Sequence, residues 1–373
     1  MHLIIVLICI YIFIKLPNTQ NLGYFCNYMI YKKFIRPLLF KFDPEKVHNF
    51  TINLLSNTML SGILSPFYNY ENEKLKTRAG SLTFKNPIGL AAGMDKNCDA
   101  LQSWNALGFG FAEIGTVTPL PQEGNPKPRM FRLREYGGII NRLGFNNCGA
   151  DEFKEKLAGM REKLPRDFII GVNLGKNKHT ALDDAYQDYK FTFEKCFEHA
   201  DYFTINVSSP NTEGLRQLQQ KKYLDEILKS LQGLNKELDK LYSGSTKDIY
   251  LKIAPDLTEK ELEDILQVSI DNNLTGIIAT NTTVSRATLP EGNYETGGLS
   301  GKPLEPIANS VIKFVMKRAG GNLAVIACGG ISSFDDVKEK LDIGASLVQL
   351  YTGLIYEGPG LVKRLKKELA RKQ

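Results

Sequence analysis

The sequence predicts an α/β protein built as a (β/α)₈ barrel, with a two-helix extension at its N-terminal side. After residue 85, short apolar or β-branched runs recur eight times, and stretches with helical periodicity separate them. Runs such as 168–172 and 322–327 are almost continuously apolar, which is typical of strands buried on both faces of a parallel sheet. An open doubly wound sheet is the alternative, but no G-x-G-x-x-G motif follows the first strand. The predicted strands are 86–92, 111–117, 168–174, 201–207, 248–254, 275–281, 322–328 and 345–351, and the clearest helices are 221–241, 259–272 and 360–372.

The composition is that of an ordinary folded protein. The chain has 373 residues, of which 43% are hydrophobic and 24% charged, with a net charge of +6. These values exclude a disordered, collagen-like or polytopic membrane protein, and nucleic acid is not needed to explain so mild a charge. The six cysteines form no C-x-x-C pair and there are only four histidines, so we expect no metal site. A barrel uses roughly 250 residues, which leaves about a hundred to explain.

The first 28 residues contain an unbroken apolar run. It covers residues 3–14 and ends at Lys15 and Pro17. Twelve residues are fewer than the roughly 20 that span a membrane, and neither a basic leader nor a small-x-small cleavage site is evident. The segment 1–28 can be an uncleaved anchor, a partial span, or an upstream extension of a reading frame that starts at Met29.

The next segment, 29–65, predicts two short amphipathic helices. A first stretch interleaves bases with large apolar side chains, and a second helix is predicted over 45–60 with Asp43 as N-cap and Pro44 at its first position. Such helices suit an anionic membrane surface, or they pack on the main domain with their bases solvated. The residues alone leave both options open. The bases are Lys32, Lys33, Arg36 and Lys41.

Polar residues end the predicted barrel strands, where barrels carry their chemistry. Lys, Asn, Ser, Thr and Gly prevail, without a carboxylate pair, a histidine or a nucleophilic cysteine. This pattern favours an anionic planar ligand held by amides over metal hydrolysis or glycosidase chemistry. The glycine-rich loops 297–301 and 329–330 and the segment 351–353 suit a phosphate. Each feature has an ordinary alternative as a turn or a solvated side chain, but eight polar strand ends together favour a site.

Three side chains stand out within this pattern. Lys252 ends a strand, where a fixed cation can stabilise an anionic reduced cofactor. Lys96 can pair with a substrate carboxylate. Ser209 lies between two asparagines on a proline-containing loop, where it is positioned rather than packed.

The ordered motifs resemble the dihydroorotate dehydrogenase family, and the basic aromatic helices place the resemblance with its membrane-associated, quinone-dependent class 2. The likeness runs from about residue 29 to the C-terminus. It implies one FMN per chain in the mouth of the barrel 66–373 and oxidation of dihydroorotate to orotate in pyrimidine synthesis, with a membrane quinone as acceptor. The motifs are Ala91-Ala-Gly-Met-Asp-Lys96, Gly115-Thr-Val-Thr-Pro119, Gly124-Asn-Pro-Lys-Pro-Arg129, Asn141-Arg-Leu-Gly-Phe-Asn146, Asn206-Val-Ser-Ser-Pro-Asn-Thr212 and Gly297-Gly-Leu-Ser-Gly301.

The resemblance also assigns residues. It implies FMN contacts from Ala92, Gly93, Thr116, Asn173, Asn206, Lys252, Thr280, Gly301, Gly330, Tyr351 and Thr352. It implies an orotate site made of Lys96, Asn141, Arg142, Leu143, Gly144, Phe145, Asn206, Asn211, Asn281 and Thr282, and a quinone tunnel near His48, Arg132 and Tyr351. Ser209 matches the base that takes the C5 proton, with Thr212 or a water as a hypothetical next relay member. The soluble class typically has Cys in place of Ser209, and Leu143 stands where Met or Tyr is more usual.

Three alternatives make different predictions. A soluble relative would use NAD or fumarate, another flavin barrel such as a tRNA dihydrouridine synthase would need RNA-binding features, and a non-enzymatic membrane scaffold would be colourless. The resemblance favours a peripheral protein on the cytoplasmic face of a bacterial membrane, because no Arg-rich transit peptide precedes the helices; a mitochondrial inner membrane is the alternative.

Overall fold

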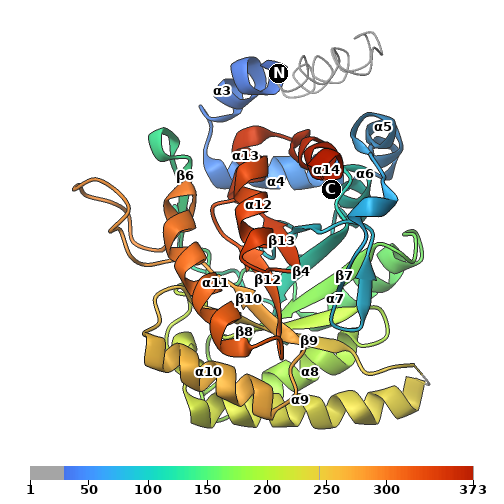
Figure 1. Ribbon diagram of the computed structural model, residues 1–373, viewed down its shortest axis with the longest axis vertical. Coiled ribbons are helices and arrows are strands. Elements are labelled where there is room, and N and C mark those ends of the chain that lie inside the picture. The colour runs from blue at the N-terminus through green and yellow to red at the C-terminus, as the bar shows by residue number, and fades with distance from the viewer. Residues whose placement is uncertain (1–28, 243, 373) are drawn as a thin grey trace.

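The computed structural model describes residues 29–242 and 244–372. The apolar run 3–14 therefore lies outside the described residues. Eight parallel strands close into a (β/α)₈ TIM barrel in chain order, which confirms the predicted fold and all eight predicted strands (Figure 1). The barrel strands are β3 (Ile88–Leu90), β4 (Phe111–Val117), β7 (Ile169–Leu174), β8 (Tyr202–Asn206), β9 (Asp248–Ile253), β10 (Gly276–Ala279), β12 (Ala324–Cys328) and β13 (Leu347–Leu350).

The side chains of these strands alternate between two environments, as the pleat of a strand requires. On β4, Ala112 and Ile114 pack outward into the layer beneath the helices, whereas Phe111 belongs to a separate apolar cluster inside the barrel. Six other barrel strands contribute one buried residue each to that inner cluster, and Phe84 packs edge-on against Phe111 at 5.1 Å between ring centroids. The lower part of the barrel is thus filled with apolar side chains, and polar side chains occupy only the levels above it.

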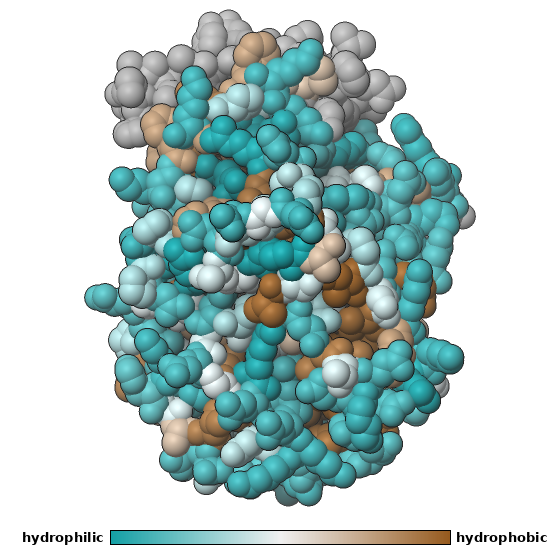
Figure 2. Space-filling view, turned by 90° about the vertical axis from the view of Figure 1, so that its left-hand side faces the viewer, coloured by the Kyte–Doolittle hydropathy of each residue, from teal (hydrophilic) through white to brown (hydrophobic). Residues whose placement is uncertain are grey.

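The helices around the barrel are amphipathic. In α9, apolar residues recur at helical spacing and face the strands, and α10 begins with a capping box in which Thr258 and Glu261 exchange hydrogen bonds. The face of the molecule in Figure 2 is mostly hydrophilic, with apolar residues in smaller groups. The helices are α6 (Leu101–Ala106), α7 (Ala150–Arg161), α8 (Ala185–Cys196), α9 (Lys221–Tyr242), α10 (Glu259–Asp271), α11 (Glu305–Ala319), α12 (Phe334–Asp342), α13 (Thr352–Glu357) and α14 (Leu361–Lys372).

The N-terminal extension packs on the barrel and differs from the prediction in where its helices begin and end. The predicted single helix over 45–60 is wrong, because the chain leaves the helix after Leu55 and a new one starts at Thr58. Asn57 causes the restart: its side-chain oxygen accepts a hydrogen bond from the Met59 amide and caps the second helix. The elements are η1 (Tyr31–Ile35), α3 (Arg36–Leu39), α4 (Pro44–Leu55) and α5 (Thr58–Tyr68), so that α5 continues past the predicted boundary at residue 65.

Two small sheets that the sequence did not predict complete the fold. The hairpin of β1 (Thr77–Ala79) and β2 (Leu82–Phe84) precedes the first barrel strand. An antiparallel sheet joins β5 (Met130–Leu133), β6 (Gly138–Asn141) and β11 (Gly298–Gly301), and so ties the excursion after β4 to the one after β10. Within residues 29–242 and 244–372, no helix is both long and apolar enough to cross a membrane.

Candidate active site

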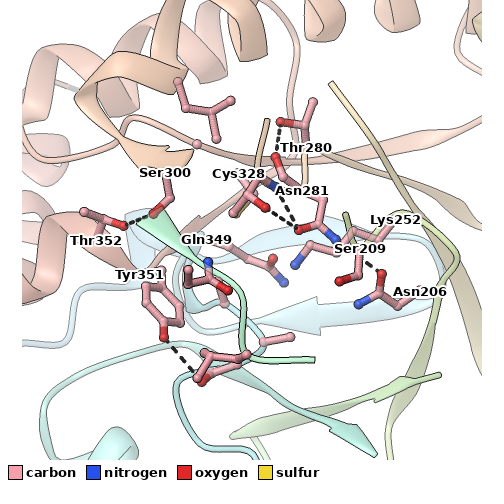
Figure 3. A pocket seen from close by; sticks show the side chains of 18 of the residues that line it. Asn206, Ser209, Lys252, Thr280, Asn281, Ser300, Cys328, Gln349, Tyr351 and Thr352 are labelled. Atoms are coloured by element: carbon pink, nitrogen blue, oxygen red, sulfur yellow. Dashed lines mark hydrogen bonds between the residues drawn. The ribbon is translucent and has the colours of Figure 1, made fainter. Parts of the chain in front are cut away.

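One cavity of about 1000 Å³, measured out to its open mouth, lies at the C-terminal ends of the barrel strands. The structure brings most of the predicted site residues into its wall, from the ends of seven of the eight barrel strands and from the antiparallel sheet (Figure 3). The predicted residues that line it are Ala92, Gly93, Lys96, Thr116, Asn141, Leu143, Gly144, Phe145, Asn206, Ser209, Asn211, Lys252, Thr280, Asn281, Thr282, Gly301, Gly330, Tyr351 and Thr352.

Four predicted residues lie elsewhere. Asn173 is fully buried beneath the cavity and accepts a hydrogen bond from Thr116 Oγ1 at 2.5 Å. Arg142 turns its guanidinium away, toward the carboxylate of Glu295 at 2.8 Å. His48 and Arg132, predicted for the quinone tunnel, belong to the contact between the extension and the barrel and do not line this cavity.

The asparagines form a network that orders the walls. Asn206 donates to Asn173 Oδ1 at 3.1 Å, and Asn281 donates to Asn206 Oδ1 at 3.3 Å. Asn211 donates to Asn141 Oδ1 at 3.1 Å, which links the loop after β8 to the antiparallel sheet. Rigid amide donors and acceptors are therefore arranged around the cavity, a geometry suited to a planar polar ligand.

Ser209 is buried in the loop after β8 and faces the cavity (Figure 3). Its Oγ accepts a hydrogen bond from the Asn211 amide at 3.3 Å, which fixes the side chain and leaves its proton free to point elsewhere. Thr212, three residues further along the loop, has a buried Oγ1 with no hydrogen-bond partner in the described part of the chain. The relay that Thr212 was predicted to join stays a hypothesis.

Two lysines bring positive charge to the site. Lys252 is almost fully buried on β9 and lies 3.5 Å from the carboxylate of Glu113. Lys96 sits in the wall near the extension, where burial lowers its pKa to about 8 although Glu45 pulls the other way. On α4, burial and the nearby charge of Lys96 lower the pKa of His48 to about 3, so this imidazole is neutral at physiological pH.

Glycines let the backbone close the outer part of the cavity. Gly301 has φ +89° and a Cβ there would lie 2.2 Å from the Gly137 carbonyl oxygen; Gly330 has φ +76° and a Cβ would lie 2.2 Å from Glu305 Cβ. Neither position accepts a side chain. Ser300 and Thr352 share a hydrogen bond of 2.8 Å beside Gly301.

Sequence reasoning did not select four residues that belong to the site or support it, namely Glu113, Gln349, Ser300 and Cys328. Glu113 lies in the middle of an apolar run and Gln349 just before a strand end, so neither stood out as a polar strand terminus. One signal in the sequence could have identified Glu113. An acid within a buried apolar strand needs partners at inward positions of other strands. Ser300 and Cys328 also line the cavity.

The fold and this cavity define a (β/α)₈-barrel protein with a polar cavity at the mouth of the barrel and a helical extension beside it. A sequence model of the family described as dihydroorotate dehydrogenase matches residues 74–372. The chain belongs to the dihydroorotate dehydrogenase family.

Relatives and solved structures agree with this membership. The chain is similar to proteins named dihydroorotate dehydrogenase (quinone) from Christiangramia forsetii, 45% identical over 92% of this chain and 99% of the relative, and from Gloeobacter violaceus, 46% identical over 90% and 92%. A crystal structure of DHODH from Eimeria tenella in complex with ferulenol superposes with a TM-score of 0.81 at 38% identity, covering 88% of this chain and 91% of the other.

Proposed function

We propose that this protein oxidises dihydroorotate to orotate with a quinone as electron acceptor, in pyrimidine biosynthesis. The observation that carries the proposal is the convergence of Ser209, Lys96 and the asparagine amides on one cavity, in a chain whose relatives are named for that reaction. Relatives with the same printed name span nearly the whole described chain, the extension included.

We propose FMN as the cofactor, one per chain, and the chemistry of the cavity fits it. Gln349 Oε1 is buried, borders the cavity and has no donor among the described residues, so it can accept a ring N–H. The residues that would hold the group are Ala92, Gly93, Thr116, Asn206, Lys252, Thr280, Gly301, Gly330, Tyr351 and Thr352, with Asn173 acting from beneath. Bound FMN supplies a two-electron acceptor for the hydride from C6 of the substrate and a donor for a quinone.

The side chains divide the work on dihydroorotate. The Lys96 ammonium pairs with the substrate carboxylate, and Asn141, Asn211 and Asn281 orient the planar ring by hydrogen bonds. Ser209 Oγ takes the proton from C5 of the substrate. A serine has a high intrinsic pKa, so its position and a path for the proton must assist it.

The extension supplies a membrane contact in this proposal. Large apolar side chains are exposed on it, among them Phe34, Met59 and Ile63. Two of its predicted membrane-facing bases meet the protein instead: Lys32 pairs with Glu357 at 2.8 Å, and Arg36 donates to the Tyr356 carbonyl at 2.9 Å. The extension thus combines packing on the main domain with a membrane contact: one of its faces packs on the barrel, and its large apolar side chains are exposed on the outside.

We propose that the extension 29–65 covers a quinone path to the barrel 66–373 near His48, Arg132 and Tyr351. Arg132 donates to the Phe42 carbonyl at 2.8 Å and stacks over the Phe40 ring at 4.5 Å, at the joint between extension and barrel. We further propose a peripheral location on the cytoplasmic face of a bacterial membrane, with a mitochondrial inner membrane as the alternative.

Anaerobic spectroscopy tests the function directly. The purified protein should be yellow, dihydroorotate should bleach the flavin band, and ubiquinone or menaquinone analogues should restore it faster than NAD or fumarate. A colourless protein to which added FMN does not bind would overturn the proposal. Faster reoxidation by NAD or fumarate would reject the quinone as acceptor.

A further inference from the structure

A single carboxylate organises the level of the barrel beneath the cavity. Glu113 on β4 is fully buried, directly above the inner apolar cluster of which Phe111 is part. Donors from four other strands converge on it: Asn173 Nδ2 at 2.7 Å, Lys252 Nζ at 3.5 Å, Gln349 Nε2 at 2.7 Å, Thr204 Oγ1 at 3.1 Å and Tyr202 OH at 3.4 Å. Burying a charge so completely is costly unless it is paired and hydrogen-bonded, and here it is both.

Glu113 decides which end of each neighbouring amide faces the cavity. An ionised carboxylate only accepts hydrogen bonds, so Gln349 and Asn173 must turn their NH₂ groups toward it. Their carbonyl oxygens then point the other way. Asn173 Oδ1 accepts from Thr116 and Asn206, and Gln349 Oε1 is left at the cavity without a donor in the described chain.

Glu113 also supplies the counter-charge of Lys252. The Lys252 side chain is 6% exposed and borders the cavity, and Glu113 is the carboxylate paired with it. Within a low-dielectric interior, the field of a lone buried cation would reach a bound ligand strongly, and a paired anion reduces that field. Figure 3 places Lys252, Gln349 and Ser209 around the same space.

We propose that Glu113 is a positioning residue for the cofactor: it limits the positive charge that Lys252 presents to the bound FMN and orients Gln349 Oε1 to accept the N–H of its ring. The proposal rests on the proposed function for the presence of FMN. It has two measurable consequences, one on the midpoint potential of the flavin and one on its affinity.

The direction in which each variant changes the flavin midpoint potential follows from the charge that it removes. Reduction adds negative charge to the flavin, so a more positive surrounding favours the reduced form. Glu113→Gln removes the counter-charge and should shift the reduction equilibrium at least tenfold toward reduced flavin, a rise of about 30 mV for a two-electron couple. Lys252→Met should lower the potential, and Glu113→Gln/Lys252→Met, which removes both charges, should lie between the two single variants. Glu113→Asp keeps the charge and serves as the matched control, with a potential near that of the wild type.

The experiment is dye-coupled anaerobic titration of the FMN-loaded proteins, with the urea unfolding of each variant measured in parallel. An unchanged or lowered potential in Glu113→Gln, or an equal rise in Glu113→Asp, would overturn the proposal; a purely structural residue would change unfolding alone. Should Glu113→Gln not fold, the charge-balanced double variant must still lie above Lys252→Met, and equality of the two would reject the idea.

The affinity for FMN tests the second part of the proposal, the orientation of Gln349. Gln349→Met keeps the volume and the net charge but removes the acceptor, so FMN should dissociate about tenfold more readily, as measured by the recovery of free-flavin fluorescence. Unchanged FMN affinity would reject the orientation of Gln349. These outcomes are separable from failure of the proposed function, because a wild-type protein that binds no FMN fails before any variant is compared.

Discussion

Glu45 and Arg129 form a buried bidentate ion pair that joins the N-terminal extension to the mouth of the barrel. Arg129 Nη2 lies 2.7 Å and Nε 3.2 Å from Glu45 Oε1, and Nε lies 3.1 Å from Oε2. Arg129 Nη1 also donates to the carbonyl oxygens of Glu123 and Asn125. One guanidinium therefore holds α4 and the loop that leads into β5 in a fixed relation.

Breaking this pair should loosen the extension. Glu45→Ala leaves a buried guanidinium without its anion, and we expect the free energy of unfolding to fall by about 3 kcal/mol. Urea denaturation followed by tryptophan fluorescence measures it. The control is Glu73→Ala, which removes an exposed pair with Lys76 and should leave the free energy of unfolding nearly unchanged. Equal losses in the two variants would contradict the role assigned to Glu45.

The same pair predicts a pH dependence. Burial raises the pKa of Glu45, but the hydrogen bonds and charge of Arg129 outweigh it, so the pKa lies below its usual value. A carboxyl with a lowered pKa in the folded state stabilises fully above its unfolded pKa of about 4.3 and loses that contribution as the pH falls through the folded pKa. The stability gap between wild type and Glu45→Gln should be constant from about pH 6 to 8 and shrink below about pH 4. A gap that widens with acid would contradict this.

Ser209→Ala should separate binding from chemistry. Removal of the proposed base is expected to slow flavin reduction by dihydroorotate about 10²- to 10⁴-fold while FMN stays bound and quinone still reoxidises it. Stopped-flow absorbance resolves the two half-reactions. Ser208→Ala is the neighbouring comparison: Ser208 Oγ donates to Asn206 Oδ1 at 3.2 Å and accepts from Asn281 Nδ2 at 3.0 Å but does not line the cavity, so this variant disturbs the amide network, keeps the cavity hydroxyl and should slow reduction far less. Near-normal reduction in Ser209→Ala would remove Ser209 from its role.

Orotate binding should weaken in mild alkali. Burial lowers the pKa of Lys96 to about 8, so the ammonium that we propose as the partner of the ligand carboxylate is lost as the pH rises through that value. The dissociation constant of orotate, read from the flavin spectrum, should rise up to tenfold for each pH unit above about 8. Lys96→Arg keeps its charge throughout, so its profile should be flat whatever its absolute affinity. A flat profile in the wild type would exclude Lys96 from the carboxylate contact.

Exposed apolar side chains of the extension should carry the membrane contact. Phe34 is 69% and Met59 78% exposed, and Leu241, at 71%, lies on α9 at the opposite end of the molecule (Figure 1). The single variants Phe34→Asp and Met59→Asp should each reduce sedimentation with vesicles of anionic phospholipid at least fivefold. Each variant lacks one large apolar side chain that the wild type can bury in the lipid. Leu241→Asp should sediment as the wild type does. Equal loss in all three would point to general destabilisation.

The sequence predicts the barrel well because its signal is local. Each barrel strand is a run such as Phe168-Ile-Ile-Gly-Val, buried on both faces, and the strands pair with their neighbours in chain order, so the closing pair of β13 with β3 is the one distant pairing that the barrel requires. The sheet of β5, β6 and β11 depends on a distant choice: Asn141 pairs with Gly298, 157 residues away, and neither strand has an alternating pattern. The break at Asn57 was missed because its cap competes with a helical pattern that continues on both sides.

The candidate site shows the same difference between residues that a local pattern identifies and residues that depend on distant partners. Residues at strand ends, such as Lys252 and Asn206, could be selected because barrel topology assigns that position to function. Glu113 could not, because its partners lie on β7, β8, β9 and β13 and only the closed barrel brings them together. Arg142 belongs to a recognisable motif, but its side-chain direction depends on Glu295, a residue of a distant loop.

The contact of η1 and α3 with α13 determines when the extension can dock during synthesis of the chain. Tyr31 OH donates to the Ile355 carbonyl at 2.6 Å and Arg36 to that of Tyr356, across 324 and 320 residues of chain. On the ribosome, therefore, the apolar extension emerges first and cannot finish docking until nearly the whole barrel has been translated. During that interval Phe40 and its neighbours are without the Tyr356 ring against which they finally pack. The nascent chain thus exposes this apolar surface for most of its synthesis. A lipid surface or a chaperone that covered it would act before the barrel has folded.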